Sequence, residues 1–279
     1  NGAPTSQTSV TFGFTTTHPA TAIDCSLDGA AYAPCTSPYT SPVLADGPHA
    51  LRIRATAGAK VGSPTTRTWT IDTVAPAATI VSGPAAVTNT PTATFDFAVS
   101  EPGSAFRCSL TGAASAPCVD PASFTGLTNG KHSLTVSAVD PAGNQGAAAL
   151  ARWEVDRKRP ILTARIPGFR NLPTARTGVL AITARCNERC SLVLRARIVV
   201  PRASGRGSTT ITIANRSVTS AANATSKLRL CLNAAQLRRV RQALGAGKNV
   251  RISLTVVATD RAGNATVALP GVTLRPSRS

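Results

Sequence analysis

Apolar and polar residues alternate along several short stretches of the chain. Val10, Phe12 and Phe14 are separated by polar or small residues, and the same period of two recurs at Leu51 and Ile53. This period is typical of a half-buried β-strand, because successive side chains of a strand point to opposite faces. Gly, Pro, Asn and Asp separate the stretches, as turns require. Several such strands within about 80 residues favour a two-sheet β-sandwich over an α/β fold.

A cysteine-bounded segment of eleven residues occurs twice, 83 residues apart: CSLDGAAYAPC at 25–35 and CSLTGAASAPC at 108–118. The similarity extends on both sides of the segment. Each repeat closes on a similar motif, WTIDTVAP at 69–76 and WEVDRKRP at 153–160. Self-similarity at a fixed period indicates an array of like modules.

We therefore predict an all-β protein of three tandem β-sandwich modules, at residues 1–75, 76–158 and 159–279. The second module has a leading segment, PAATIVSG at 76–83, that has no counterpart in the first. The first module is thus expected to lack its opening strand. Either an unseen upstream part of the protein or another chain would supply it.

The third module is divergent but related to the second. Residues 251–264, RISLTVVATDRAGN, match residues 132–144, HSLTVSAVDPAGN. Residues 233–245, NAAQLRRVRQALG, have apolar residues at helical spacing, with Asn233 as a candidate N-cap and Gly245 as a C-terminal stop. The sequence therefore predicts one short helix, in this module.

The cysteine pairs of the first two modules are equally placed. Cys25 and Cys35 are separated by nine residues, and so are Cys108 and Cys118. Equal placement predicts one local disulfide in each module, and closing an eleven-residue loop would stabilise it by roughly 3 kcal/mol. Disulfides persist in oxidising compartments, which predicts a secreted or cell-surface protein. A zinc site is disfavoured, because this spacing is not that of a zinc knuckle and no histidine lies nearby.

The three remaining cysteines lie in the third module. Cys186 and Cys190 can close a tight bridge between two strands, which leaves Cys231 unpaired. Strand parity in KLRLCL turns Cys231 to the polar side with Lys227 and Arg229, where it would suit pairing between chains or reaction with a small thiol. If the strand bulges, Cys231 is buried instead, and this is the outcome that we expect.

The positive charge is concentrated in the last module. The chain has a net charge of +18, but residues 1–150 contain 6 basic and 8 acidic residues, whereas residues 151–279 contain 24 basic and 4 acidic residues. Nearly all of the basic residues are arginine, which binds phosphate and carboxylate groups bidentately. An anionic cell-wall polymer or polysaccharide is therefore a candidate partner. A solvated basic surface that reflects GC-rich coding is the alternative.

Six arginines are the predicted contacts for a polyanion. Three of them point away from the core on two predicted strands, and three lie on the predicted helix: Arg195, Arg197, Arg251, Arg238, Arg239 and Arg241. Specific nucleic-acid binding is not predicted, because aromatic residues for base stacking are nearly absent after Trp153.

The sequence contains no assembly of catalytic residues that we recognise. Its histidines are His18, His49 and His132, and the last two occupy the same repeat position, which favours a structural role. No cofactor motif is present. Asp140 and Asp260 could bind calcium at module junctions, but the Asp-x-Ala-Gly-Asn context favours a turn role, so no metal site is predicted. No apolar run approaches the ~18 residues of a membrane span, so no transmembrane segment is predicted.

The segment CSLDGAAYAPCTSPYT, with LADGPHALRIRATA and TRTWTIDTVAP after it, resembles the bacterial Ig-like repeats found in tandem in large secreted proteins of actinobacteria. The second module shows the same pattern, so that the resemblance covers about 160 residues. The third module is similar to the divergent, Arg-rich sandwich that often follows such arrays. The resemblance implies an Ig-like fold and extracellular display, and it supplies no catalytic residue.

We therefore predict a non-enzymatic extracellular structural or adhesive protein. Its tandem Ig-like modules would act as a stalk, spacer or surface fibre, held to an anionic envelope polymer by the basic module. Because the chain opens with Asn1 and contains no methionine, we expect it to be the C-terminal piece of a longer product. Two alternatives are accessory modules of a larger secreted enzyme, which bind substrate or wall, and a filament subunit completed by strand donation. The incomplete first module and Cys231 are the two candidate routes of self-association.

Overall fold

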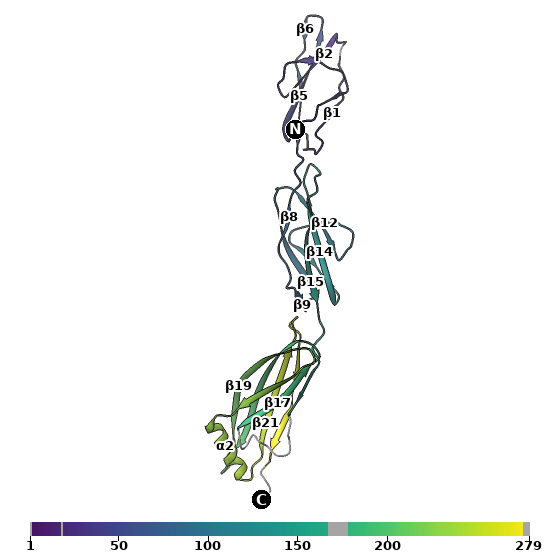
Figure 1. Cartoon of the computed structure of the whole chain (residues 1–279). Coiled ribbons are helices and arrows are strands. Elements are labelled where there is room, and N and C mark those ends of the chain that lie inside the picture. Colours follow the sequence, from purple (N-terminus) through teal and green to yellow (C-terminus); the bar gives the residue numbers. More distant parts are fainter. Residues whose placement is uncertain (1, 18, 167–177, 276–279) are drawn as a thin grey trace. The chain divides into compact units, whose positions relative to one another are not determined.

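The computed structural model describes residues 2–17, 19–166 and 178–275. The described residues form 23 strands and one α-helix, so the fold is nearly all β, as predicted. The strands make six sheets, which we group by sequence into a first, a second and a third sheet pair (Figure 1). Among the described residues, no helix combines the length and the apolar character that crossing a bilayer requires.

The first sheet pair consists of a two-stranded sheet and a five-stranded sheet. The small sheet pairs β1 (Thr11–Phe12) with β4 (Tyr39–Thr40). The large sheet has the order β3-β2-β5-β6, with β7 also on β5, and its strands are β2 (Ala22–Leu27), β3 (Ala33–Pro34), β5 (Gly47–Ala57), β6 (Lys60–Val61) and β7 (Thr65–Ile71). Leu51 and Trp69 are buried between the sheets, with Phe12 and Phe14 packed against them.

The second sheet pair has three strands in one sheet and five in the other. The smaller sheet has the order β13-β10-β8, with β8 (Ala78–Ser82), β10 (Ala93–Val99) and β13 (Ala122–Phe124). The larger has the order β12-β11-β14-β15-β9, with β9 (Val87–Thr88), β11 (Ala105–Leu110), β12 (Ala116–Cys118), β14 (Gly130–Val139) and β15 (Ala149–Val155). Phe95 contacts Trp153 of the opposite sheet, with ring centroids 5.1 Å apart.

The third sheet pair contains the longest strands. One sheet has the order β16-β17-β20, with β16 (Leu162–Arg165), β17 (Val179–Cys186) and β20 (Thr225–Cys231). The other has the order β19-β18-β21-β22, with β23 also on β21, and its strands are β18 (Cys190–Pro201), β19 (Ser208–Ser220), β21 (Val250–Thr259), β22 (Ala265–Ala268) and β23 (Gly271–Leu274). Buried residues alternate with exposed or half-buried ones on β18 and β21, and the buried set fills one continuous core with Leu, Ile, Val and Ala.

The predicted helix is observed as α2 (Ala234–Gly245), beside the third sheet pair (Figure 1). Asn233 is its N-cap, as predicted, and forms a capping box with Gln236. Val240 and Ala243 join the core of the sandwich. Because β21 follows α2 directly, α2 lies at the end of the sandwich where β21 begins.

The described chain divides into two compact units. The first contains Asn1–Pro84, Thr92–Gly126 and Lys131–Trp153, and the second contains Ala85–Pro91, Leu127–Gly130 and Glu154–Ser279. The division passes through one end of the second sheet pair. The three modules with boundaries near residues 75 and 158 therefore stay a prediction.

Candidate functional site

His49 of the first repeat is held by an aspartate at a tight turn, and His18 lies outside the described residues. Asp28 and Gly29 follow β2 with φ angles of 51° and 80°, as a type I′ hairpin turn requires. This turn places Asp28 Oδ2 2.8 Å from His49 Nδ1, while His49 Nε2 lies 2.8 Å from the Ala45 carbonyl oxygen. Because both ring nitrogens face acceptors, the doubly protonated imidazolium is favoured.

Both partners of this pair have shifted pKa values. The Ala45 carbonyl and then the Asp28 carboxylate raise the pKa of His49, against the effect of burial. Burial alone would raise the pKa of Asp28, but the backbone N–H of Ala50 and the His49 ring outweigh it and lower the pKa. An imidazole whose Nε2 is bonded to a backbone carbonyl has no free nitrogen to act as a general base, so the geometry is that of a structural clamp.

The second repeat builds the same clamp without the charge pair. Thr111 stands where the first repeat has Asp28, and its Oγ1 lies 3.3 Å from His132 Nδ1. Each histidine also lies against the tryptophan of its own repeat, with ring centroids 5.7 Å apart for His49 and 5.6 Å apart for His132. The indole N–H groups of both tryptophans are buried without a hydrogen-bond partner in the described part of the chain.

The predicted turn at Asp140 gathers three carboxyl groups. Asp140 accepts hydrogen bonds from the backbone N–H of Asn144 at 2.8 Å and from its side-chain amide at 2.8 Å. The same amide donates to the Asp72 carbonyl at 2.7 Å. Asp72, Glu101 and Asp140 each place one carboxylate oxygen within 4.8 Å of the others. We call these three residues the first carboxylate trio.

The third sheet pair repeats this arrangement. Asp260 accepts hydrogen bonds from the backbone and side-chain amides of Asn264, both at 2.9 Å, and the side-chain amide also donates to the Asp156 carbonyl at 2.8 Å. Asp156, Glu188 and Asp260 form the second carboxylate trio. The turn role predicted for Asp140 and Asp260 is therefore observed, whereas the glutamates of the trios were not predicted.

Each trio raises the pKa of its glutamate. For Glu101, burial raises the pKa first, and the charges of Asp72 and Asp140 raise it further. For Glu188, burial again comes first, followed by the charges of Asp260 and Asp156. Close like charges disfavour full ionisation of all three groups.

The pKa of Asp140 itself is lowered. Burial acts to raise it, but the hydrogen bonds from Asn144, Gly143 and Ala142 outweigh that effect. A trio offers three oxygens toward the six to eight that Ca²⁺ takes. Both oxygens of Asp140 already accept hydrogen bonds from Asn144, so the arrangement is that of an anchored turn.

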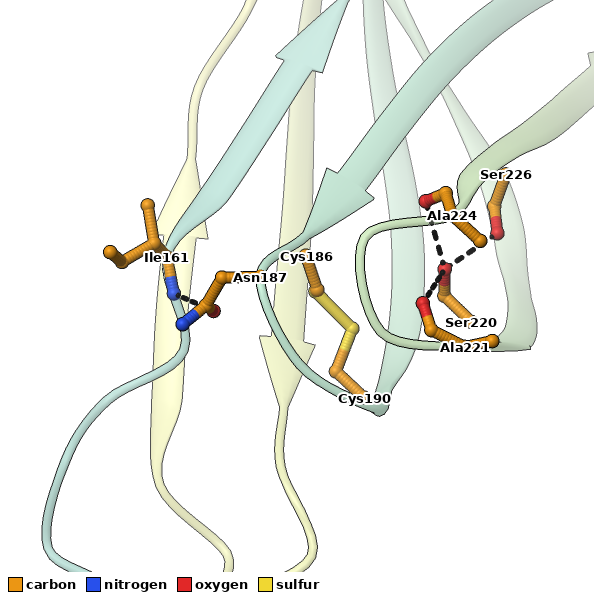
Figure 2. The surroundings of a disulfide bond; sticks show 8 residues. All are labelled: Ile161, Cys186, Asn187, Cys190, Ser220, Ala221, Ala224 and Ser226. Atoms are coloured by element: carbon orange, nitrogen blue, oxygen red, sulfur yellow. Dashed lines mark hydrogen bonds between the residues drawn. A yellow bond between two sulfur atoms is a disulfide. The ribbon is translucent and has the colours of Figure 1, made fainter.

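The third predicted bridge, Cys186–Cys190, closes the turn between β17 and β18. Figure 2 shows hydrogen bonds on both sides of it. The Asn187 side chain accepts from the Ile161 N–H at 2.7 Å, and the Ser226 hydroxyl donates to the Ser220 hydroxyl at 2.9 Å. The structure forms the other two predicted bridges as well, Cys25–Cys35 and Cys108–Cys118.

The expectation that Cys231 is buried is wrong. Cys231 is a free, exposed cysteine at the end of β20. The strand does not bulge, since Val179 to Arg185 of β17 pair residue by residue with Cys231 to Thr225. Parity therefore holds, and the thiol shares the outer face with Lys227 and Arg229.

The six predicted arginines all lie on the surface. Arg195, Arg197 and Arg251 are exposed on the outer face of the β18–β21 sheet, where Arg197 pairs with Ser253 and Arg251 pairs with Val199. The structure therefore brings these three together, as predicted. The other three, Arg238, Arg239 and Arg241, are exposed on α2.

The sequence reasoning missed a second basic face. On the outer face of the β16-β17-β20 sheet, Arg165 and Arg185 are exposed beside Lys227 and Arg229. Alternation in LTAR and ITARC turns both arginines away from the core, which was a usable signal. Their common face depends on how β16, β17 and β20 pair.

No family model matches the chain, and no curated protein does. Among solved structures, the chain is similar to the fibronectin(III)-like modules of Clostridium thermocellum CbhA, at 12% identity over 55% of this chain and 87% of that one, with a TM-score of 0.37. It is similar to a tetra-tandem repeat from the extending region of a large adhesion protein, at 16% identity over 98% and 72%, with a TM-score of 0.37. A 1.5-MDa bacterial ice-binding adhesin matches at 14% identity over 90% and 84%, with a TM-score of 0.39. Since these TM-scores lie below 0.5, the β-sandwich fold rests on the sheets and cores described above.

Proposed function

We propose that the chain is a non-enzymatic, extracellular structural protein made of three β-sandwich modules, each with a disulfide. The third module is basic and binds an anionic envelope polymer. The extracellular setting is supported by the three disulfides, which persist in oxidising compartments. The observation that carries the binding function is the separation of charge in the third sheet pair.

Acidic residues are confined to one end of this sandwich. Residues 151–279 contain four, and Asp156, Glu188 and Asp260 of these form the second carboxylate trio. Asp260 follows the last residue of β21, whereas α2 precedes its first residue. The ten residues of β21 span roughly 33 Å, several times the Debye length of about 8 Å at physiological salt. Basic residues toward the α2 end, among them Arg229 of β20, therefore lie beyond the range of the trio's charge and attract polyanions.

Retention of the full chain on an immobilised anionic polymer tests this function. We expect binding at low salt, with the logarithm of the affinity falling linearly as the logarithm of the salt concentration rises, because bound counterions are released. A neutral polymer on the same support is the control. Absence of binding, or binding that salt does not weaken, would contradict the proposal.

A second candidate function is assembly by strand addition to the first sheet pair. In the second sheet pair, residues Asp96–Val99 of β10 pair with β8. The equivalent residues 13–16 follow β1 and belong to no strand, and β1 pairs with β4 alone among the described residues. Phe14 N–H still bonds Ser37 Oγ at 2.9 Å, as Phe97 N–H bonds Asp120 at 2.7 Å. The segment is thus held in place beside an edge to which a strand can add.

A peptide with the sequence of residues 76–84 tests this second function in trans. We expect it to bind the full chain, because it contains β8 and would cover the half-buried Phe12 and Phe14. The matched control carries Ile80→Asp, which places a charge at the position that pairs with Phe97 in the second sheet pair. Equal binding of the two peptides, or of neither, would contradict strand addition. Fusion of the same segment before Asn1 should then block binding of the free peptide.

A further inference from the structure

The outer face of the β16-β17-β20 sheet carries four basic side chains that we call the basic ladder: Arg165, Arg185, Lys227 and Arg229. All four are exposed. The other outward positions of these strands are threonine, alanine, valine and the thiol of Cys231, with no carboxylate among them. Neither of the ion pairs found in the described chain, His49–Asp28 and Arg54–Asp24, involves the ladder.

The strand register sets the spacing of the ladder. Thr183 of β17 pairs with Arg165 on one side and with Lys227 on the other, so these three residues form one row across the sheet. Neighbouring strands lie about 4.8 Å apart, which separates Arg165 from Lys227 by roughly 10 Å. Arg185 and Arg229 lie two residues along their strands from this row, a step of about 7 Å.

No ion pair of the described residues involves the ladder, although Glu188 follows Arg185 by three residues. Like charges this near to each other on one face repel. The distances between the ladder residues are comparable with the Debye length of about 8 Å, so solvent ions screen this repulsion only in part. A ligand with repeated negative charges relieves the repulsion at several positions at once. Three of the four ladder residues are arginines, whose guanidinium groups match phosphate and carboxylate oxygens in pairs.

On the opposite face of the sandwich, the outer face of the β18–β21 sheet, the basic residues are spread over a larger surface. There, Arg195, Arg197 and Arg251 lie among valines, and Val193 and Val257 are half-buried neighbours on the same face. That sheet has five strands, against three for the sheet of the ladder. The ladder therefore offers more charge for each unit of surface.

Building on the proposed function, we infer that the basic ladder is the main contact for a linear polyanion that carries one negative charge every 7–10 Å or so. A phosphodiester polymer and a carboxylated polysaccharide share this chemistry. The extended polymer lies across β17 and β20. Thr225 pairs with Arg185 and offers a hydroxyl donor beside it, whereas the Thr183 hydroxyl donates to the Arg165 carbonyl.

Two matched triple variants of the full chain test the ladder. The first carries Arg185→Gln, Lys227→Gln and Arg229→Gln, and the control carries Arg195→Gln, Arg197→Gln and Arg251→Gln. Both lose three positive charges. Affinities for poly(glycerol phosphate) and polygalacturonate are measured between about 50 and 200 mM salt. We expect the ladder variant to bind about tenfold more weakly at low salt with a shallower salt dependence, and the control to change by less than about threefold.

Cys231 provides a second readout in the unmodified chain. Its thiol is exposed at the end of the ladder, two residues from Arg229, and the six other cysteines of the chain are in bridges. We expect saturating polymer to slow alkylation of Cys231 severalfold, whereas a neutral polymer of equal length leaves the rate unchanged.

The outcomes distinguish two hypotheses: that the basic ladder is the main contact, and that the chain binds an anionic polymer at all. Binding by the unmodified chain with equal losses in both variants, or with Cys231 unprotected, overturns the ladder and leaves polymer binding in place. No binding by the unmodified chain overturns both. Tighter binding to duplex DNA than to either polymer overturns the assigned ligand class, and a preference between the two polymers identifies the source. Thermal unfolding of each variant controls for loss of folding.

Discussion

The first and second sheet pairs are built from the same repeat, but only the second has a sealed core. Phe95 and Phe97 of β10 are 1% and 6% exposed. Their equivalents in the first pair, Phe12 and Phe14, are only partly buried. β10 extends over Ala93–Val99, whereas β1 consists of Thr11–Phe12 alone.

The difference follows from β8. This strand pairs with the second half of β10 and contributes the buried Ala78 to the core. Gly83, directly after it, lies so close to Phe95 that a Cβ there would be 2.8 Å from the ring. Among the described residues, no strand pairs with residues 13–16, so their backbone groups lack the ladder partners that would keep them extended. One strand therefore decides both the burial of two phenylalanines and the length of the strand that holds them.

Truncation of the equivalent phenylalanines should give the largest difference between the two pairs in the free energy of unfolding that is lost. Phe95→Ala is expected to lower the free energy of unfolding of the second pair by about 3–5 kcal/mol, because it leaves a cavity in a sealed core. Phe12→Ala should cost the first pair only about 1–2 kcal/mol, since part of its ring already contacts water. The chain has two tryptophans, Trp69 and Trp153, one in each pair. Fluorescence-detected denaturation in Trp153→Phe and Trp69→Phe backgrounds therefore reports each pair separately, and equal losses would contradict the comparison.

Removal of the disulfides should affect the two pairs alike. Cys25→Ser with Cys35→Ser, and the corresponding change at Cys108 and Cys118, each open a loop with a sequence separation of 10. The chain-entropy model gives a loss of about 3 kcal/mol for each. In the third sheet pair, opening the loop of Cys186–Cys190, with a separation of 4, should cost about 2 kcal/mol. Thermal unfolding by calorimetry measures these losses, and a far larger loss in the first pair would show that its open core depends on the bridge.

Local patterns in the sequence were sufficient for much of this fold. Alternation identified the strands that contain Phe12 and Leu51, because burial of one strand face is a local property of period two. The predicted strand extended too far at Phe14, which belongs to no strand. The cap at Asn233 is equally local. The repeat itself predicted that the first module lacks a counterpart of β8 within this sequence.

The sites that the sequence did not reveal depend on pairing between distant segments. Glu101 reaches Asp140 from a turn 39 residues earlier, and nothing in either local pattern states that the two turns meet. The ladder has the same origin, since Arg165 and Arg185 share a face through the register of β16 and β17. At Cys231 the local pattern was correct and our expectation was wrong. Strand parity predicts the outward orientation that the structure shows, but we expected a bulge that would bury the side chain.

An exchange of the turn residues should convert one histidine clamp into the other. Asp28→Thr removes the carboxylate that raises the pKa of His49, so that pKa should fall. Thr111→Asp should stabilise the second pair by about 1 kcal/mol, because it adds a charge-assisted hydrogen bond to His132 and removes a β-branched residue from a φ of 49°. NMR titration of the imidazole resonances and denaturation of each variant check these expectations. A His49 pKa unchanged by Asp28→Thr would mean that the Ala45 carbonyl alone sets it.

The same clamp predicts a pH dependence for the first pair. The folded-state pKa of His49 is raised above 6.5, so its contribution to stability is complete below pH 6.5 and is lost as the pH rises through the raised value. The folded-state pKa of Asp28 is lowered below 3.8, so its contribution is present above pH 3.8 and is lost on acidification. Stability measured by the Trp69 signal should therefore decline as the pH rises past 6.5, and Asp28→Thr should flatten the decline. A decline unaltered in that variant would assign it to other groups.

The smallest expected effect comes from Glu101. The first repeat has His18 at the equivalent sequence position, and it has TAGAKVG in place of the Asp-x-Ala-Gly-Asn turn. Burial and the charges of Asp72 and Asp140 raise the pKa of Glu101 above 4.5, so its contribution to stability is complete below pH 4.5 and is lost as the pH rises through the folded-state value. Glu101→Gln should remove this dependence and raise the stability of the second pair slightly at neutral pH. Glu188→Gln provides the matched change in the third sheet pair, where the pKa is raised for the same reasons. Denaturation monitored at Trp153 between about pH 4 and 7 tests Glu101, and a Gln variant with lower stability at neutral pH would show that the ionised trio stabilises the turn that it surrounds.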